Sequence, residues 1–200
     1  MIKFLICALI LVLSGCEQHE DVIVDSTHKG PVGRLVKYVN LTENESIDLI
    51  RKVENILPKK VKDAIYKTTN KIEIVAGDAN AFMKYMKGKD IEFTDYDYKG
   101  IAGYGFEPKT IVYSILDEYV LIHELAHAYE YSFWYDGTKD NPSSSWKWKE
   151  AYKSEYISKL GQKNVMEFYA ECFAMYFRNP KMLEKLCPMA YELLDREFKN

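Results

Sequence analysis

The sequence has no excess of either charge, because 27 lysine and arginine residues nearly balance 30 aspartate and glutamate residues and leave a formal net charge of -3. A balance this close provides no strong field for nucleic acid or for an anionic membrane surface. The sequence also contains no internal repeat and no run of basic residues. Its 200 residues are roughly the length of one domain and can bury a real core. We therefore expect one globular domain whose function rests on local motifs.

A short apolar run stands near the N-terminus, over residues 4–13 and directly behind Lys3. A helix needs about 20 apolar residues to span a bilayer, so this run predicts a signal peptide over residues 1–16. The segment ends in Leu-Ser-Gly-Cys16, which resembles the bacterial lipobox, where the cysteine is acylated, for instance with palmitate, and becomes the new N-terminus. A buried N-terminal helix or an uncleaved anchor are the alternatives. We expect a lipid on Cys16 to hold the protein on the extracellular or periplasmic face of the cell membrane.

Residues 17–40 are polar and have no clear period, which predicts a tether between the lipid and a domain over residues 41–200. Two cysteines, Cys172 and Cys187, remain in that domain. An oxidising compartment permits a disulfide between them, but two buried free thiols are an equally good interpretation.

The order of predicted elements is a few strands followed mainly by helices. Alternating or β-branched residues predict strands at 34–39, 71–76 and 110–115. Helical patterns and helix-starting prolines predict helices at 42–57, 60–67, 118–134, 146–160 and 164–178, after Pro180, and from Pro188. This order predicts an α+β fold.

The segment His123-Glu124-Leu125-Ala126-His127 has the HExxH pattern. Residues four apart on a helix share one face, with Cβ atoms roughly 5–6 Å apart, so the two imidazoles can bind one zinc ion. Glu124 then reaches the water on the metal instead of the metal itself, and can act as general base. Two histidines hydrogen-bonded in a packed helix are the alternative, which leaves Glu124 unexplained. The pattern therefore predicts zinc-dependent hydrolysis.

A catalytic zinc needs a third protein ligand and an open fourth position. The metzincin pattern would place glycine at 130 and histidine at 133, but this sequence has Glu130 and Phe133, which excludes that class. Glutamates on later helices are the remaining choice. Four are available: Glu150, Glu155, Glu167 and Glu171. The last two share one face of a strongly apolar helix, and the residues alone do not decide which of them binds the metal.

The segments HELAH at 123–127 and EFYAECF at 167–173 together resemble the catalytic domain of anthrax lethal factor and the Pro-Pro endopeptidases. The likeness includes GQKN at 161–164 and extends from about residue 42 to the C-terminus. It implies a zincin-like fold with a small mixed sheet, the HExxH helix and a helical C-terminal lobe. It also implies that Glu167 is the zinc ligand and that Glu171, one turn further on, orients a histidine N–H.

One position departs from that family's pattern. The family usually has a tyrosine seven residues before the ligand glutamate, and its hydroxyl stabilises the oxyanion. This sequence has Leu160 there. Tyr156, one turn earlier on the same face of the predicted helix, is our candidate for this role.

Motif and resemblance together predict a monomeric, membrane-anchored extracellular zinc endopeptidase that cleaves extended peptides with water activated by Glu124. The substrate would lie along a strand edge at 100–105, a segment that is equally consistent with a glycine-rich turn. Trp146 and Trp148 could line the cleft or cover the core. The rival functions are a non-catalytic zinc-binding lipoprotein, which Leu160 supports best, and a solute-binding or adhesion lipoprotein without metal.

Overall fold

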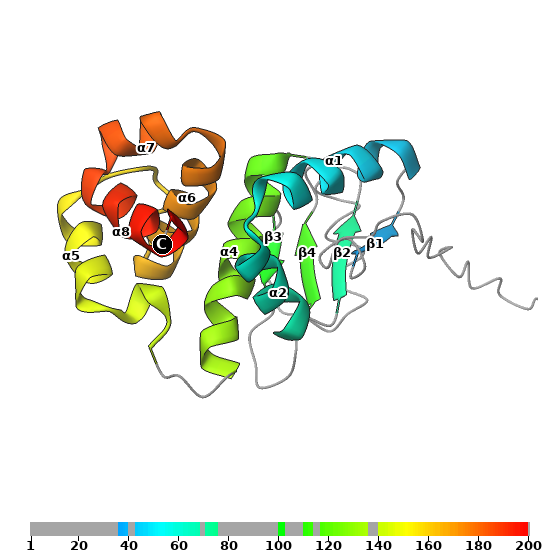
Figure 1. The fold of residues 1–200 in the computed structure, drawn as a ribbon, viewed down its shortest axis with the longest axis horizontal. Coiled ribbons are helices and arrows are strands. Elements are labelled where there is room, and N and C mark those ends of the chain that lie inside the picture. Colours follow the sequence, from blue (N-terminus) through cyan, green and yellow to red (C-terminus); the bar gives the residue numbers. More distant parts are fainter. Residues whose placement is uncertain are drawn as a thin grey trace, which may run out of the picture.

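The computed structural model in Figure 1 describes the backbone in seven ranges and the side chains in three of them. The backbone ranges are 36–39, 43–68, 71–75, 100–102, 110–113, 117–135 and 140–199. Side chains are described for residues 48–68, 117–133 and 140–199. The predicted signal peptide, with Cys16, and residues 17–35 of the predicted tether lie outside these ranges.

Four short strands pair into one sheet with the order β1-β2-β4-β3. Strand β1 (Val36–Val39) is parallel to β2 (Lys71–Val75), and β2 is parallel to β4 (Thr110–Tyr113). Strand β3 (Gly100–Ala102) lies at the end of this order and runs antiparallel to β4. The strands β1, β2 and β4 occur where alternation and β-branched residues predicted them.

Helices make up most of the described chain. Their bounds are α1 Glu43–Ile56, α2 Lys59–Thr68, α4 Glu118–Tyr135, α5 Trp146–Ser154, α6 Val165–Arg178, α7 Pro180–Leu186 and α8 Pro188–Lys199, with a 3₁₀ turn η2 at Pro142–Ser144. The helix predicted over 146–160 is wrong in length, because α5 ends at Ser154 and the chain is extended at Glu155. Among these helices, none has both the length and the apolar character needed to cross a bilayer.

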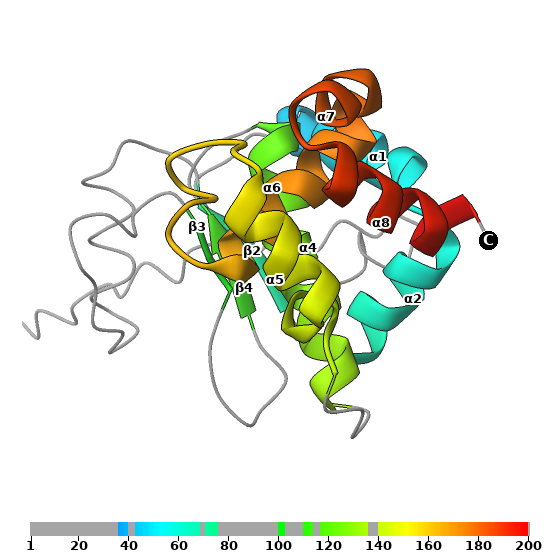
Figure 2. The ribbon, with the colours of Figure 1, turned by 90° about the vertical axis from the view of Figure 1, so that its left-hand side faces the viewer.

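Helix α4 stands between two groups of elements in Figure 1. The sheet, α1 and α2 lie on one side of it, and α5 to α8 form a helical lobe on the other. The contacts agree, since α4 packs on α6 across one face and on α1, α2, β3 and β4 elsewhere. The view in Figure 2 shows α5 and α6 in front of α4, so the lobe covers that face of the helix.

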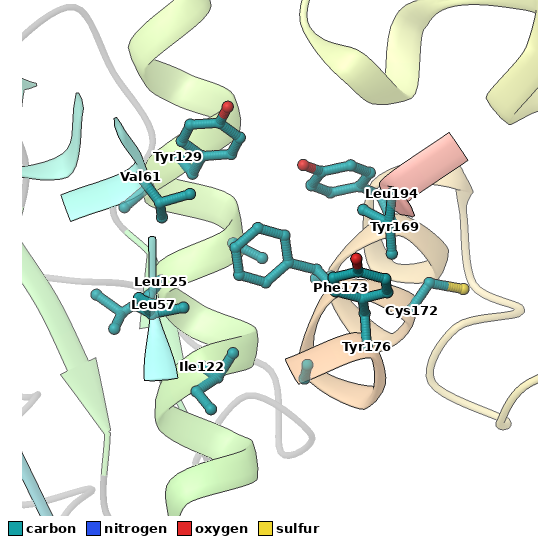
Figure 3. Close-up of a cluster of buried hydrophobic side chains, with 14 of the residues drawn as sticks. Leu57, Val61, Ile122, Leu125, Tyr129, Tyr169, Cys172, Phe173, Tyr176 and Leu194 are labelled. Atoms are coloured by element: carbon teal, nitrogen blue, oxygen red, sulfur yellow. The ribbon is translucent and has the colours of Figure 1, made fainter. Parts of the chain in front are cut away.

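The hydrophobic core lies where these helices meet. Figure 3 shows Phe173 reaching from α6 toward α4, between Leu125 on one side and Leu194 of α8 on the other. All three side chains are fully buried. Phe173 also stacks against the rings of Tyr129 and Phe177 at centroid distances of 5.9 and 4.9 Å. This aromatic packing fixes α4 against α6.

The predicted α+β class needs correction in this light. It implied a core shared between sheet and helices, whereas all buried side chains in the described part of the chain lie in helices and the turns that join them. The described core is therefore entirely helical. The side chains of the four strands lie outside the described ranges, so the correction concerns the part of the core that the helices form.

Glu130 is an acidic residue buried in the C-terminal half of α4, with 1% of its surface exposed. Its Oε1 accepts a hydrogen bond from the backbone N–H of Ser143 in η2, at 2.8 Å. Burial raises the pKa of Glu130 to about 7, against the opposing effect of the bonds from Ser143. The folded protein thus keeps this carboxyl protonated at a pH where an unfolded chain would have lost the proton.

This burial predicts a pH-dependent stability that Glu130→Gln removes. Between pH 4.5 and 7 the folded state holds a proton that the unfolded state has released, so unfolding free energy falls as pH rises, by about 3 kcal/mol from this group. Glutamine keeps an oxygen for the Ser143 bond and does not titrate. Urea unfolding of chelator-treated protein at pH 5 and 7.5 measures the difference. Glu150→Gln, at an exposed position on α5, is the control and should show the same change in unfolding free energy with pH as the wild type. If Glu130→Gln also showed the wild-type change, the raised pKa would not belong to Glu130.

Candidate metal centre

The two histidines of the HExxH pattern occupy one face of α4. Helix α4 runs from Glu118 to Tyr135, so His123 and His127 are one turn apart in its middle. Their rings lie 5.0 Å apart between centroids and are nearly perpendicular, at 81°. Residues Ile122, Leu125 and Ala126 are fully buried and anchor this part of the helix in the core. The imidazoles therefore have a fixed backbone beneath them.

Helix α6 provides a carboxylate opposite these imidazoles. The Asn164 side chain caps α6 by accepting hydrogen bonds from the backbone N–H groups of Met166 and Glu167, each at 2.9 Å. Glu167 is thus in the first turn of the helix, and its Oε2 lies 3.2 Å from Nε2 of His123 and 3.7 Å from Nε2 of His127. Two residues from one helix and one from another meet at a common point.

These three residues fit a zinc ion by chemistry and by spacing. The ligand atoms of His123, His127 and Glu167 all lie within 4.8 Å of one another. Ligands about 2.0–2.1 Å from a tetrahedral zinc are roughly 3.3 Å apart, close to the two distances that Glu167 Oε2 makes. Two imidazoles and one carboxylate are a ligand set of catalytic zinc sites. No other such group is present among the residues whose side chains are described.

Glu171 lies one turn beyond Glu167 and contacts the far side of a histidine ring. Its Oε1 is 2.9 Å from Nδ1 of His123, while Nε2 of that ring faces Glu167. A carboxylate at Nδ1 holds the proton on that nitrogen and leaves Nε2 free for a metal. The two glutamates that sequence spacing could not separate therefore lie on opposite nitrogens of His123.

The charges at this centre support one another. Burial disfavours the charged form of His123, but the contacts with Glu167 and Glu171 outweigh it and raise its pKa to about 10. Burial also opposes ionisation of Glu167, yet its contacts with the two histidines hold its pKa far below the ordinary value. The pKa of Glu171 is lowered as well, because burial, the largest single effect, is outweighed by the effects of His123 and Ser158 together. Without metal the cluster is a buried network of opposite charges.

Glu124 is buried beside the cluster but is not one of its three converging residues. Burial raises the pKa of its carboxyl, and the neighbouring His123 and His127 partly oppose this shift. A carboxylate with a raised pKa is a stronger base than one in water. This is the environment that a general base next to a metal needs.

The structure also describes the other residues that the sequence proposed for the metal site and the cleft. Glu150 is exposed on α5, and the carboxylate of Glu155 accepts hydrogen bonds from the backbone N–H groups of Met189 and Ala190 at the start of α8. Neither belongs to the group that could hold a metal ion. Trp148 is buried against Tyr169 at a centroid distance of 4.8 Å.

Tyr156 lies in the non-helical segment between α5 and α6, with 58% of its surface exposed. The helix that was expected to carry both Tyr156 and Leu160 ends at Ser154, so the argument from a shared helical face is wrong. Trp146 is also exposed, at the start of α5.

Two residues at this centre were not identified from the sequence. The Tyr119 hydroxyl donates to the backbone carbonyl of Glu171 at 3.1 Å, and Ser158 contributes to the lowered pKa of the Glu171 carboxyl. Neither residue is part of HExxH or of EFYAECF. No sequence pattern points to them.

Comparison with known proteins agrees with the resemblance seen in the sequence. The family model described as anthrax toxin lethal factor, N- and C-terminal domain, matches residues 107–197. The structure is similar to the Pro-Pro endopeptidase PPEP-2 from Paenibacillus alvei, with a TM-score of 0.62 and 18% sequence identity over 84% of this chain and 100% of that chain. No curated protein matches by sequence. The expected likeness to the lethal factor and Pro-Pro endopeptidase family is confirmed.

The geometry predicts that purified protein binds one zinc ion and that Glu167→Ala weakens binding more than the ~10–100-fold typical of an outer-shell change. Zinc at about 100 times its dissociation constant should add about 2.7 kcal/mol to stability. Affinity should fall as pH falls, because protons compete for the imidazoles. Chelator competition and thermal unfolding measure these effects.

Glu150→Ala removes an exposed carboxylate from α5 and serves as the matched control, with unchanged zinc affinity. If Glu167→Ala bound zinc as tightly as Glu150→Ala, the metal would lie elsewhere.

Proposed function

We propose that this chain is a zinc endopeptidase. The observation that carries the proposal is the convergence of His123, His127 and Glu167 within 4.8 Å, with the buried carboxylate of Glu124 beside them. Three protein ligands leave the fourth position of a tetrahedral zinc open, as catalysis requires. A purely structural zinc is more often closed by a fourth protein ligand.

Each residue would have a separate part in peptide hydrolysis. A bound zinc ion would polarise the substrate carbonyl and make water a better nucleophile at neutral pH. His123, His127 and Glu167 would hold that ion, and Glu171 would keep His123 in the correct tautomer. Glu124 would take a proton from the attacking water and deliver it to the leaving amine. The raised pKa of Glu124, caused by burial, suits both steps.

The substrate class follows from the edge strand. Strand β3 ends the sheet order β1-β2-β4-β3, and its residues Gly100–Ala102 pair with β4 on one side. Helix α4, which carries the two histidines, contacts β3. We infer that an extended peptide pairs with the edge of β3 that has no partner among the described strands, and places one peptide bond at the metal. The structural match to a Pro-Pro endopeptidase supports a peptide substrate.

The location of the enzyme is a separate part of the proposal. The lipobox-like end at Cys16 supports a lipid-anchored enzyme on the outer face of the membrane, where it would meet extracellular proteins. Metabolic labelling with a palmitate analogue in a bacterial host should label the wild-type chain and not Cys16→Ser. Equal labelling of both would refute lipidation at this residue.

A non-catalytic zinc lipoprotein is the main alternative, and Leu160 at the usual tyrosine position favours it. The two functions differ in one test. A peptide library should be cleaved by the zinc-loaded protein, and a chelator should stop the cleavage. A solute-binding or adhesion lipoprotein would bind no zinc at all.

Glu124→Gln should abolish cleavage of that library while zinc stays bound. Glutamine is nearly isosteric with glutamate but cannot accept the proton, so turnover should fall by about 10²–10⁴-fold. Metal analysis of the same sample supplies the control, since Glu124 is not among the three residues that could hold a metal ion. Full activity in Glu124→Gln would exclude its role as general base.

Tyr156→Phe tests the proposed oxyanion donor. If the exposed hydroxyl of Tyr156 reaches the substrate, its loss should lower kcat by about 10²–10³-fold and leave zinc content unchanged. Tyr66→Phe, on an exposed tyrosine of α2, is the matched control and should retain activity. Equal kcat in the two variants would assign the oxyanion to another donor.

A further inference from the structure

Helices α4 and α6 are joined by a row of polar contacts along the sides on which they face each other. Glu118, in the first turn of α4, forms an ion pair with Arg178 in the last turn of α6. At the other end of the row His127 faces Glu167, which is in the first turn of α6. The contacts follow opposite orders in the two helices, so α4 and α6 run antiparallel along this row.

Glu171 occupies the middle of the row and is contacted by two successive turns of α4. Its Oε1 lies 2.9 Å from Nδ1 of His123. Its backbone carbonyl accepts a hydrogen bond from the hydroxyl of Tyr119, at 3.1 Å. Because Tyr119 and His123 are four residues apart in one helix, they lie on the same face of α4. One residue of α6 is thus held both by its side chain and by its backbone.

The Tyr119 side chain begins from a fixed point of the backbone. Asp117 caps α4, because its Oδ1 accepts a hydrogen bond from the backbone N–H of Tyr119 at 2.7 Å. The adjacent Glu118 pairs with Arg178 of α6 and, at 3.2 Å, with Lys52 of α1. The first turn of α4 therefore has contacts with both α1 and α6, which limit the positions that the Tyr119 ring can take.

The Tyr119 hydroxyl is the donor in its contact with α6, because a carbonyl oxygen carries no proton. Burial raises the pKa of this hydroxyl, and the charge of Glu171 acts in the same direction. The hydroxyl therefore keeps its proton throughout the pH range in which imidazoles bind a metal. Its bond to a helical carbonyl opposes a shift of α6 along α4. Such a shift would move the Glu171 carboxylate away from Nδ1 of His123.

We propose that Tyr119 is a positioning residue of the metal centre: its hydroxyl fixes Glu171 on α6 so that the Glu171 carboxylate stays in line with Nδ1 of His123. The inference rests on the proposed zinc site. A carboxylate at Nδ1 directs Nε2 of the ring to the metal, and Nε2 of His123 lies 3.2 Å from Oε2 of Glu167. Tyr119 is not among the three residues that could hold the ion. It acts through Glu171, so its loss would lower metal affinity and change the ligand geometry.

Tyr119→Phe tests this role in the full chain with zinc as the probe, because it removes the hydroxyl and keeps the ring. Zinc binding should weaken by about 10-fold, the lower end of the range for partners that orient a ligand. Competition with a chromophoric chelator measures this affinity. The visible absorption of the cobalt-substituted protein should change as well, because the His123 ring is less well aligned.

Tyr129→Phe is the matched control. Tyr129 is also on α4, and its hydroxyl donates to the carboxylate of Glu197 in α8 at 2.9 Å. The control therefore also removes one hydrogen bond between α4 and the helical lobe, but it should leave the zinc affinity and the cobalt spectrum unchanged. If the two variants had equal zinc affinities and equal spectra, the positioning role of Tyr119 would be refuted.

A second measurement removes the carboxylate through which Tyr119 is proposed to act. Glu171→Ala keeps the backbone carbonyl but has no carboxylate for His123. In this background Tyr119→Phe should cause no further loss of zinc affinity. A loss of about 10-fold in both backgrounds would show that Tyr119 acts by another route, and would overturn the inference. A wild-type chain that bound no zinc would instead refute the proposed function itself, so the two failures are distinguishable.

Discussion

The contact between α4 and α6 is the constraint on which the candidate site depends. Phe173 packs into α4, and the fully buried Ile122 and Leu125 keep the facing side of α4 in the core. Because this contact fixes both the distance and the rotation of the two helices, it decides that His123 and Glu167 approach within 3.2 Å. A rotation of α6 by one residue would move its carboxylates to another face. Ligand geometry is here a result of hydrophobic packing.

Burying several charges beside that core would cost much free energy if they were isolated. In this protein each charged group has a partner of opposite sign, since Glu167 contacts both histidines and Glu171 contacts His123. The shifts in pKa follow, with the histidine raised and the two carboxyls lowered. The cluster can therefore stay charged before a metal arrives, and its shape is already set.

The sequence predicted what local spacing determines. The HELAH motif put two imidazoles on one helical face, and the apolar run with Glu167 predicted a second helix within one residue of its observed start. Spacing could not predict the contacts between segments distant in sequence. The end of α5 at Ser154, which removed the shared helical face proposed for Tyr156, depends on the docking of Glu155 on α8. The hydrogen bond from the Tyr119 hydroxyl to the backbone carbonyl of Glu171 is likewise a property of packing, which no period in the sequence contains.

The cap of α6 has a consequence for the dynamics of the site. Asn164 ties the first turn of that helix by accepting from the N–H groups of Met166 and Glu167, and Glu167 itself reaches across to the histidines. Helix ends open far more often than helix centres, and such local opening sets how fast amide protons exchange with solvent. An ion bound by residues of both α4 and α6 would hold the first turn of α6 in place. Metal release and fraying of that turn would then be one event.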